Sequence, residues 1–189
     1  MQTNWQTKKL GEVCDVIAGQ SPEGKFYNKK EKGLSFYQGK KEFGEKFIGE
    51  PTTWTTKITK EALAGDILMS VRAPVGPINF ATQKICIGRG LAVIRAGRNV
   101  NKDFLFYNLL SKQKNIVGNT GAVFASINKN DIGNLALFLP PLPEQKDVVK
   151  KIDGLAGEVK KLEGIYRQKV ADLEDLKKSV LQKAFFGEL

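Results

Sequence analysis

The last quarter of the chain has a regular alternation of apolar and polar positions. Ten positions follow a 4-3-4-3 spacing, and nine of them are apolar or aromatic. This is the spacing of a coiled-coil seam, so we predict one long α-helix over about residues 143–185. A single helix cannot bury such a stripe against itself, and it therefore needs a partner helix. The seam positions are Val148, Ile152, Leu155, Val159, Leu162, Tyr166, Lys169, Leu173, Leu176 and Val180, with Lys169 as the polar exception.

Three glycines lie within this predicted helix, at Gly154, Gly157 and Gly164. Each destabilises a helix interior by about 1 kcal/mol relative to alanine. They either weaken or kink the helix, or they allow another chain to approach closely. The sequence is compatible with both interpretations.

The first 142 residues have a different pattern, with short β-branched runs separated by glycine-rich turns. Apolar residues at helical spacing after Asn101, which can serve as an N-cap, predict one helix at about residues 102–114. Proline cannot continue a sheet ladder, so the run Pro140-Pro-Leu-Pro143 marks a boundary, and Pro143 suits the first turn of a helix. The predicted strands are residues 67–71, 85–87, 91–94 and 135–139.

These patterns predict an α+β fold with two parts. Residues 1–142 form a globular domain with a curled mixed or antiparallel sheet and few helices. Residues 143–189 form one long C-terminal coiled-coil helix.

The positive charge of the chain is concentrated outside the predicted helix. The formal net charge is +10 at pH 7, but residues 144–189 contain ten basic and nine acidic residues and contribute only +1. This distribution favours a polyanion as the ligand of the globular part, because basic side chains that neutralise phosphates release condensed counterions. Basic domains without a nucleic-acid ligand are also common, so charge alone does not assign the ligand.

The chain lacks the residues that common catalytic and metal sites need. It contains no histidine, which excludes Ser-His-Asp triads and most zinc sites. It has no phosphate-binding loop motif, and Gly88-Arg-Gly90 lacks the third glycine of a dinucleotide fingerprint. We predict no catalytic residue, no metal site and no cofactor in this chain.

Cysteine usage and hydropathy point to a cytoplasmic protein. The two cysteines, Cys14 and Cys86, lie in apolar stretches, which is typical of buried thiols in a reducing compartment. No apolar run is long enough to span a bilayer, and the first residues lack the layout of a signal peptide.

One enzymatic alternative is a small metal-dependent nuclease. Asp15 followed by Glu23-Gly-Lys25 is similar in order to the Asp…Glu-x-Lys arrangement of such enzymes. Their Glu and Lys lie on a rigid buried strand, whereas Ser21-Pro-Glu-Gly24 is typical of a turn. The nuclease is therefore the disfavoured hypothesis.

Three sequence blocks carry a family resemblance when they are considered together. In this order, and over nearly the whole chain, they closely resemble the specificity (S) subunit of type I restriction-modification systems, in which a target-recognition domain precedes a spacer helix. The blocks are residues 36–40 (FYQGK) with Phe43-Gly44; residues 65–76 (GDILMSVRAPVG) with 86–95 (CIGRGLAVIR); and residues 127–131 (INKND) with 139–145 (LPPLPEQ) and 179–189 (SVLQKAFFGEL).

The resemblance covers one target-recognition domain and one spacer helix, whereas a typical S subunit carries two of each. The chain is therefore similar to half an S subunit, either naturally encoded or produced by truncation. In the family the two helices pack antiparallel, which implies that the seam of this chain pairs with a second copy. A two-fold dimer is expected to read an inverted-repeat, bipartite target with an unread spacer.

The same resemblance implies a non-catalytic role. Such a chain directs a methyltransferase (M) subunit and a restriction (R) subunit to double-stranded DNA, and its spacer helix offers the docking surface for the M subunit. S-adenosylmethionine, ATP and magnesium are then expected in the partner subunits. The alternative is a coiled-coil interaction or decoy module that binds the methyltransferase without reading DNA.

The resemblance locates the recognition domain but not its base contacts, which we predict from side-chain chemistry. Glutamine pairs with the edge of adenine, basic side chains contact guanine or phosphate, and aromatic rings stack. Trp54 fits a core position better than stacking, and Arg72 and Arg89 fit scaffold or phosphate roles better than base reading. The candidate DNA-contacting residues are Lys25, Tyr27, Tyr37, Gln38, Lys40, Lys41, Trp54, Arg72, Arg89, Asn119 and Thr120.

Overall fold

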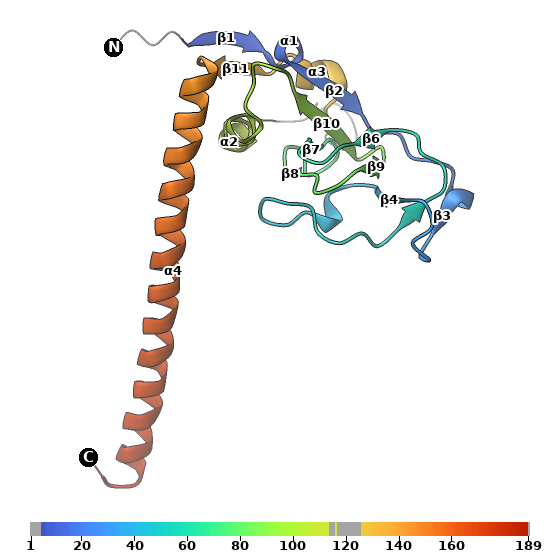
Figure 1. Ribbon diagram of the computed structural model, residues 1–189. Helices are drawn as coiled ribbons and strands as arrows, with labels where there is room; N and C mark the ends of the chain where they lie inside the picture. Colours follow the sequence, from blue (N-terminus) through green and yellow to red (C-terminus); the bar gives the residue numbers. More distant parts are fainter. Residues whose placement is uncertain (1–4, 114–115, 117–125, 189) are drawn as a thin grey trace. The chain divides into compact units, whose positions relative to one another are not determined.

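The computed structural model of the protein describes residues 5–113, 116 and 126–188. The chain divides into two compact units, residues 1–146 and 147–189. The first unit contains the strands and the short helices, and the long helix α4 (Leu142–Phe185) begins in the first unit and forms most of the second (Figure 1). A mixed α and β unit followed by one long helix confirms the predicted α+β fold.

Strands in the described part of the first unit form three sheets. An antiparallel ribbon pairs β1 (Gln6–Lys9) with β11 (Ala136–Leu139). An antiparallel four-stranded sheet has the order β2 (Cys14–Ala18), β10 (Leu91–Ala96), β7 (Ile67–Ser70) and β8 (Ile78–Phe80). A mixed five-stranded sheet, in which β4 and β9 run parallel, has the order β3 (Tyr27–Asn28), β5 (Trp54–Thr55), β4 (Leu34–Tyr37), β9 (Ile85–Ile87) and β6 (Glu61–Ala62).

The helices of the first unit are short. The longest, α2, begins directly after Asn101, whose side chain accepts a hydrogen bond from the Phe104 amide at 2.9 Å, so the predicted N-cap is confirmed. None of the helices among the described residues is long and apolar enough to cross a membrane. The remaining elements are α1 (Leu10–Val13), α2 (Lys102–Lys112), α3 (Lys129–Gly133) and the 3-10 turns η1 (Gly24–Phe26) and η2 (Lys40–Glu42).

The central strands of the four-stranded sheet are buried on both faces. Along β10, Ala92 and Ile94 pack into an apolar core that includes Leu105 of α2. Leu91 and Val93, on the opposite face, pack into a second core with β4, β6 and β9 of the five-stranded sheet. Residues 91–94 are therefore an uninterrupted apolar run instead of an alternating one, because neither face of this sheet meets solvent there.

Both cysteines are buried free thiols in the cores of the first unit, as the sequence predicted. Burial raises the pKa of the Cys14 thiol to about 11. The Cys14 thiol is therefore not a reactive nucleophile at neutral pH.

The first turn of α4 is fastened within the first unit by a fully buried glutamine, Gln145. Its side-chain oxygen accepts a hydrogen bond from the Asn101 amide at 2.7 Å. Its side-chain nitrogen donates to the carbonyls of Asn99 at 3.0 Å and Pro140 at 2.9 Å. One side chain thus satisfies three backbone groups and links the Pro-rich boundary to the loop before α2.

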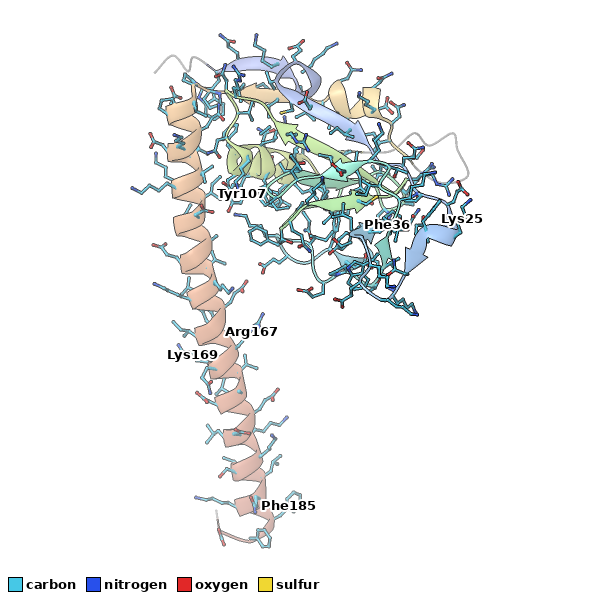
Figure 2. The ribbon with its side chains drawn as sticks, turned by 45° about the vertical axis from the view of Figure 1, so that its right-hand side comes forward. Lys25, Phe36, Tyr107, Arg167, Lys169 and Phe185 are labelled. Atoms are coloured by element: carbon cyan, nitrogen blue, oxygen red, sulfur yellow. The ribbon has the colours of Figure 1, made fainter. Side chains whose placement is uncertain are left out.

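Helix α4 exposes its apolar side chains along the second unit (Figure 2). Along the seam from Leu155 to Val180, the exposed fraction of the apolar side chains runs from 43% at Val180 to 64% at Tyr166 and Leu173, while Val148 and Ile152 are partly buried. The chain is helical through all three glycines, and a Cβ added at any of them would meet no described atom within 4 Å. The large apolar residues of α4 that are more than two-fifths exposed are Leu155, Val159, Leu162, Ile165, Tyr166, Val170, Leu173, Leu176, Val180, Leu181 and Phe185.

We predict that Gln145→Ala lowers the free energy of unfolding by about 1–3 kcal/mol, because it leaves buried backbone groups without partners. Urea unfolding followed by tryptophan fluorescence measures the change, since both tryptophans lie in the first unit. Gln168→Ala is the matched control, because the Gln168 side chain is exposed and donates a hydrogen bond to the exposed Asp172 carboxylate at 2.8 Å. That control should change stability by less than about 0.5 kcal/mol. Equal losses in the two variants would contradict the fastening role of Gln145.

Candidate nucleic-acid interface

The ends of several strands meet at one edge of the first unit. Strands β4 and β9 run parallel, with Tyr37 opposite Ile87, so both end at the same level. Strand β10 runs antiparallel to β7, with Leu91 opposite Ser70, so the start of β10 lies beside the end of β7. The segments that follow these ends carry five of the eleven predicted DNA-contacting residues. We call them the strand-end region: Ser21, Gln38–Lys41, Arg72 and Arg89.

Backbone hydrogen bonds join this region in a continuous row. The Gly90 amide donates to the Gln38 carbonyl, and the Val71 amide donates to the Gly90 carbonyl, each at 3.0 Å. The next residue, Arg72, pairs with Ser126 as an isolated bridge. Gln38, Arg89 and Arg72, far apart in sequence, are thereby held next to one another by backbone contacts.

Three glycines allow this close meeting of backbones. A Cβ at Gly19 would lie 2.1 Å from the Gly88 carbonyl oxygen, and a Cβ at Gly90 would lie 2.5 Å from the Gln38 carbonyl oxygen. A Cβ at Gly88 would lie 2.9 Å from the Gln38 Cα. No other residue fits at these positions without moving the backbone.

The Gln38 side chain is exposed but oriented. Its Oε1 accepts a hydrogen bond from the Ser21 hydroxyl at 2.9 Å, and the Ser21 oxygen accepts one from the Arg89 amide at 3.1 Å. Because Oε1 is held in this way, the amide nitrogen is the group left for a ligand. Ser21 was not among the predicted DNA-contacting residues, because its link to Gln38 and Arg89 depends on the fold.

Lys40, Lys41, Arg72 and Arg89 supply positive charge around Gln38. Arg72, Arg89 and Lys41 are exposed, and Lys40 is partly exposed in the turn η2. In the described part of the chain, no acidic side chain forms an ion pair with any of these four. Among the described residues, the region therefore presents four cationic side chains that are not ion-paired.

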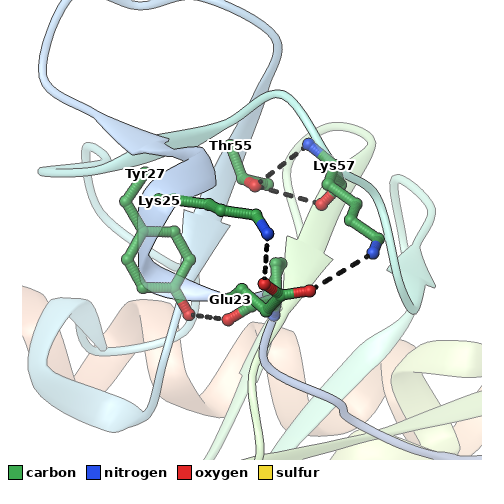
Figure 3. Close-up of polar contacts among 6 residues, drawn as sticks. Glu23, Lys25, Tyr27, Thr55 and Lys57 are labelled. Carbon is green, nitrogen blue, oxygen red and sulfur yellow. Dashed lines mark hydrogen bonds and ion pairs between the residues drawn. The ribbon is translucent and has the colours of Figure 1, made fainter.

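A second group of predicted residues lies at η1 and β3, where Figure 3 shows the polar contacts. Lys25 pairs with Glu23 at 2.6 Å, and Lys57, which the sequence analysis did not select, lies 3.8 Å from the same carboxylate. The Tyr27 hydroxyl donates to the Pro22 carbonyl at 2.8 Å, and its ring stacks on Phe36 with centroids 4.8 Å apart. Tyr27 therefore supports the fold of this loop, while Lys25 points to its surface.

Tyr37 corrects one expectation. Its side chain is only 1% exposed, and its hydroxyl donates to the Gly49 carbonyl at 2.9 Å. Burial, reinforced by the Glu50 and Glu42 carboxylates, raises the pKa of Tyr37 to about 12. The ring belongs to the second core, so it is not available to contact DNA in this structure.

The remaining predicted DNA-contacting residues are Trp54, Asn119 and Thr120. Trp54 is partly buried in β5, between β3 and β4, and is not among the described residues of either apolar core. Asn119 and Thr120 lie outside the described residues.

The structure does not bring together the residues of the nuclease hypothesis. Asp15 lies on β2 opposite Arg95, whereas Glu23 precedes η1 and pairs with lysines. Among the described residues, no group of three or more His, Cys, Asp and Glu side chains is arranged to hold a metal ion.

The sequence matches the type I restriction modification DNA specificity domain over residues 2–167. The chain belongs to this family. One curated relative and one solved structure, described below, are specificity subunits, which are non-catalytic, and this agrees with the prediction that the chain is not an enzyme.

Two solved structures and one curated relative match the whole length of this specificity-domain chain. It is 38% identical over 190 residues to the putative type I restriction enzyme MjaX specificity subunit of Methanocaldococcus jannaschii, covering 98% of this chain and 44% of that protein. The HsdS subunit from Thermoanaerobacter tengcongensis has a TM-score of 0.82 and 38% identity, covering 100% of this chain and 46% of that one.

The second solved structure concerns complex assembly and conformational transition of the type I R-M system. One of its chains has a TM-score of 0.89 and 39% identity, covering 100% of this chain and 47% of its own length. The specificity-domain chain thus spans about half the length of the relatives that it matches.

We predict that Gly90→Ala lowers the free energy of unfolding by about 1–3 kcal/mol, because the added methyl group overlaps the Gln38 carbonyl. Thermal and urea unfolding measure the loss. Gly39→Ala is the control, since it adjoins Gln38 in extended backbone (φ −166°) and its Cβ would meet no described atom within 4 Å. We expect it to change stability by less than about 0.5 kcal/mol. Equal stability of the two variants would contradict the close contact between the Gly90 backbone and the Gln38 carbonyl.

Proposed function

We propose that this chain is the sequence-specific DNA-recognition subunit of a type I restriction-modification system, and that it contacts double-stranded DNA through the strand-end region. The observation that carries the proposal is the convergence of Gln38, Arg72 and Arg89 at strand ends joined by backbone hydrogen bonds. An oriented amide beside guanidinium groups has the chemistry to read a base edge while phosphates are neutralised.

The proposed division of roles follows from how each side chain is held. Gln38 is oriented by Ser21 and is proposed to read a base, because a fixed amide discriminates between donor and acceptor patterns. Lys40, Lys41, Arg72 and Arg89 are proposed to contact phosphates. Such contacts position the protein on the duplex without specifying sequence.

The exposed seam of α4 supports a dimer of this chain. Its apolar side chains extend over many helical turns, which is the pattern of a helix that packs against another helix. We propose that a second copy covers the seam in antiparallel orientation. Two recognition units related by a two-fold axis then read a bipartite, inverted-repeat target.

The proposed partners are a methyltransferase subunit, docked on the spacer helix, and a restriction subunit. We propose that S-adenosylmethionine, ATP and magnesium bind those subunits, that this chain is non-catalytic, and that the complex works in the cytoplasm. The alternative role is a decoy that binds the methyltransferase without reading DNA. The basic strand-end region favours DNA recognition, since a decoy has no need of an oriented glutamine among cations.

A homodimer that reads DNA requires a symmetric target. Mapping of methylated positions in DNA from cells that express this chain with its methyltransferase should give a symmetric, interrupted motif. Leu162→Glu with Leu173→Glu places carboxylates in the seam and should weaken the dimer by about 100-fold, because unpaired charges are costly to bury. Light scattering measures the mass, and the methylated motif should disappear with the dimer.

The control for the seam variant is Gln168→Glu with Gln182→Glu, which adds the same charge away from the seam. It should retain both the dimer and the motif. An asymmetric motif from the wild-type chain would contradict a homodimer as the reader.

Base reading and phosphate binding should respond differently to substitution. Gln38→Ala should weaken binding to a duplex with the mapped motif by about 5–100-fold, with little change for a scrambled duplex. Lys40→Ala should weaken binding to both duplexes and reduce the slope of log affinity against log salt by about one. Fluorescence anisotropy at several salt concentrations measures both effects.

Ser21→Ala is the matched control for Gln38, since it keeps the amide but removes the hydroxyl that orients it. A smaller loss of discrimination is expected than for Gln38→Ala. Unchanged DNA affinity in Gln38→Ala and Lys40→Ala, with methyltransferase binding retained, would favour the decoy.

A further inference from the structure

Two lysines from separate segments of the first unit converge on one carboxylate (Figure 3). Lys25 belongs to η1 and lies 2.6 Å from one oxygen of Glu23. Lys57 follows β5 and lies 3.8 Å from the other oxygen. Each oxygen of Glu23 thus faces a different ammonium group.

Both cations also contact one aromatic ring. The two ammonium groups lie over the ring of Phe26, at 5.2 Å for Lys25 and 5.1 Å for Lys57. The Thr55 hydroxyl, whose residue is fully buried, donates to the Lys57 carbonyl at 3.0 Å and accepts from the Lys57 amide at 3.2 Å, which fixes the backbone of Lys57. The two lysines therefore share the Phe26 ring as well as the Glu23 carboxylate.

Glu23 itself is free to leave. Its side chain is 61% exposed, and the backbone turn of η1 depends on its carbonyl, which accepts from the Phe26 amide at 3.0 Å. Ion pairs between exposed side chains contribute little to stability because water and salt screen them. The carboxylate can therefore rotate into solvent without disturbing the turn.

We propose that Glu23 occupies the place of a DNA backbone phosphate between Lys25 and Lys57, and that the phosphate displaces it when the duplex binds. A phosphate offers two anionic oxygens to the same two cations. This inference rests on the proposed DNA-binding function. Glu23 is then an internal competitor that lowers affinity for DNA of any sequence, and so increases the dependence of binding on correct base contacts.

The test uses the full-length chain and a duplex of about 30 base pairs without the mapped motif. Glu23→Gln keeps the size of the side chain and removes its charge. It should raise the affinity for this duplex about 3–10-fold at moderate salt and steepen the salt dependence by about one counterion. Anisotropy titrations between low and moderate salt measure both quantities, and thermal unfolding checks that the variant is folded.

Asp175→Asn is the matched control, because it also raises the net charge by one and breaks an exposed ion pair, the one between Asp175 and Lys178 at 3.2 Å. It lies on α4 and should change the affinity less than twofold. Adding Lys25→Ala and Lys57→Ala to Glu23→Gln should remove the gain in affinity. Reversal by these substitutions ties the effect to the lysine pair.

Two results would overturn the inference. One is an equal gain in Glu23→Gln and Asp175→Asn, which would make the effect one of overall charge. The other is a loss of affinity in Glu23→Gln, which would make Glu23 a support for the lysines instead of a competitor. A wild-type chain that binds no duplex at any salt would instead refute the proposed function, and an acidic surface of a partner subunit would then be the occupant of the lysine pair.

Discussion

The candidate interface depends on one steric constraint, a backbone crossing with no room for a methyl group. Gly19, Gly88 and Gly90 bring the ends of β2, β4, β9 and β10 within direct contact of one another. The contacts that position Gln38 and Arg89 are therefore mostly backbone contacts, which do not depend on the identity of the exposed side chains. A surface built in this way can change its polar side chains, and with them the bases that it reads, without a change of fold.

The two cores explain how such a surface is kept rigid. Strands β7 and β10 carry apolar side chains on both faces, so they are fixed from two sides while their ends reach solvent. The buried charge in this frame is also paired, since Asp66 accepts three hydrogen bonds from Arg95, of 2.9, 3.2 and 2.7 Å. This pairing raises the pKa of Arg95. Arg95 thus serves the frame, whereas Arg72 and Arg89, which lie beyond the strand ends, are available to a ligand.

The elements that could be predicted from the sequence are those with a local signal, such as buried residues at a regular spacing or a capping side chain. The seam of α4, the N-cap Asn101 and the apolar runs near residues 67 and 91 all have local signals, and all form the expected elements. Strands β3, β5 and β6 were missed because two residues cannot show an alternation, and the longer strands β1, β2, β4 and β8 were also not predicted.

In the candidate site, Tyr37 ends β4 and is buried like Ser35 and Phe36 before it, whereas Gln38 lies beyond the strand and is exposed, a difference that composition alone does not reveal. The partners Ser21 and Lys57 come from other segments, so they could not be identified before the fold was known.

The seam of α4 also constrains the proposed antiparallel pair. One register, centred on Gly164, brings each of the ten seam residues opposite another seam residue. If one helix slides along the other by one heptad, two of the ten residues face positions outside the seam. In that register Lys169 faces Val159, so two lysines never meet, and the three glycines lie away from the seam. Their cost to helix stability is then not offset by closer packing of the two seams. The facing pairs are Val148 with Val180, Ile152 with Leu176, Leu155 with Leu173, Val159 with Lys169, and Leu162 with Tyr166.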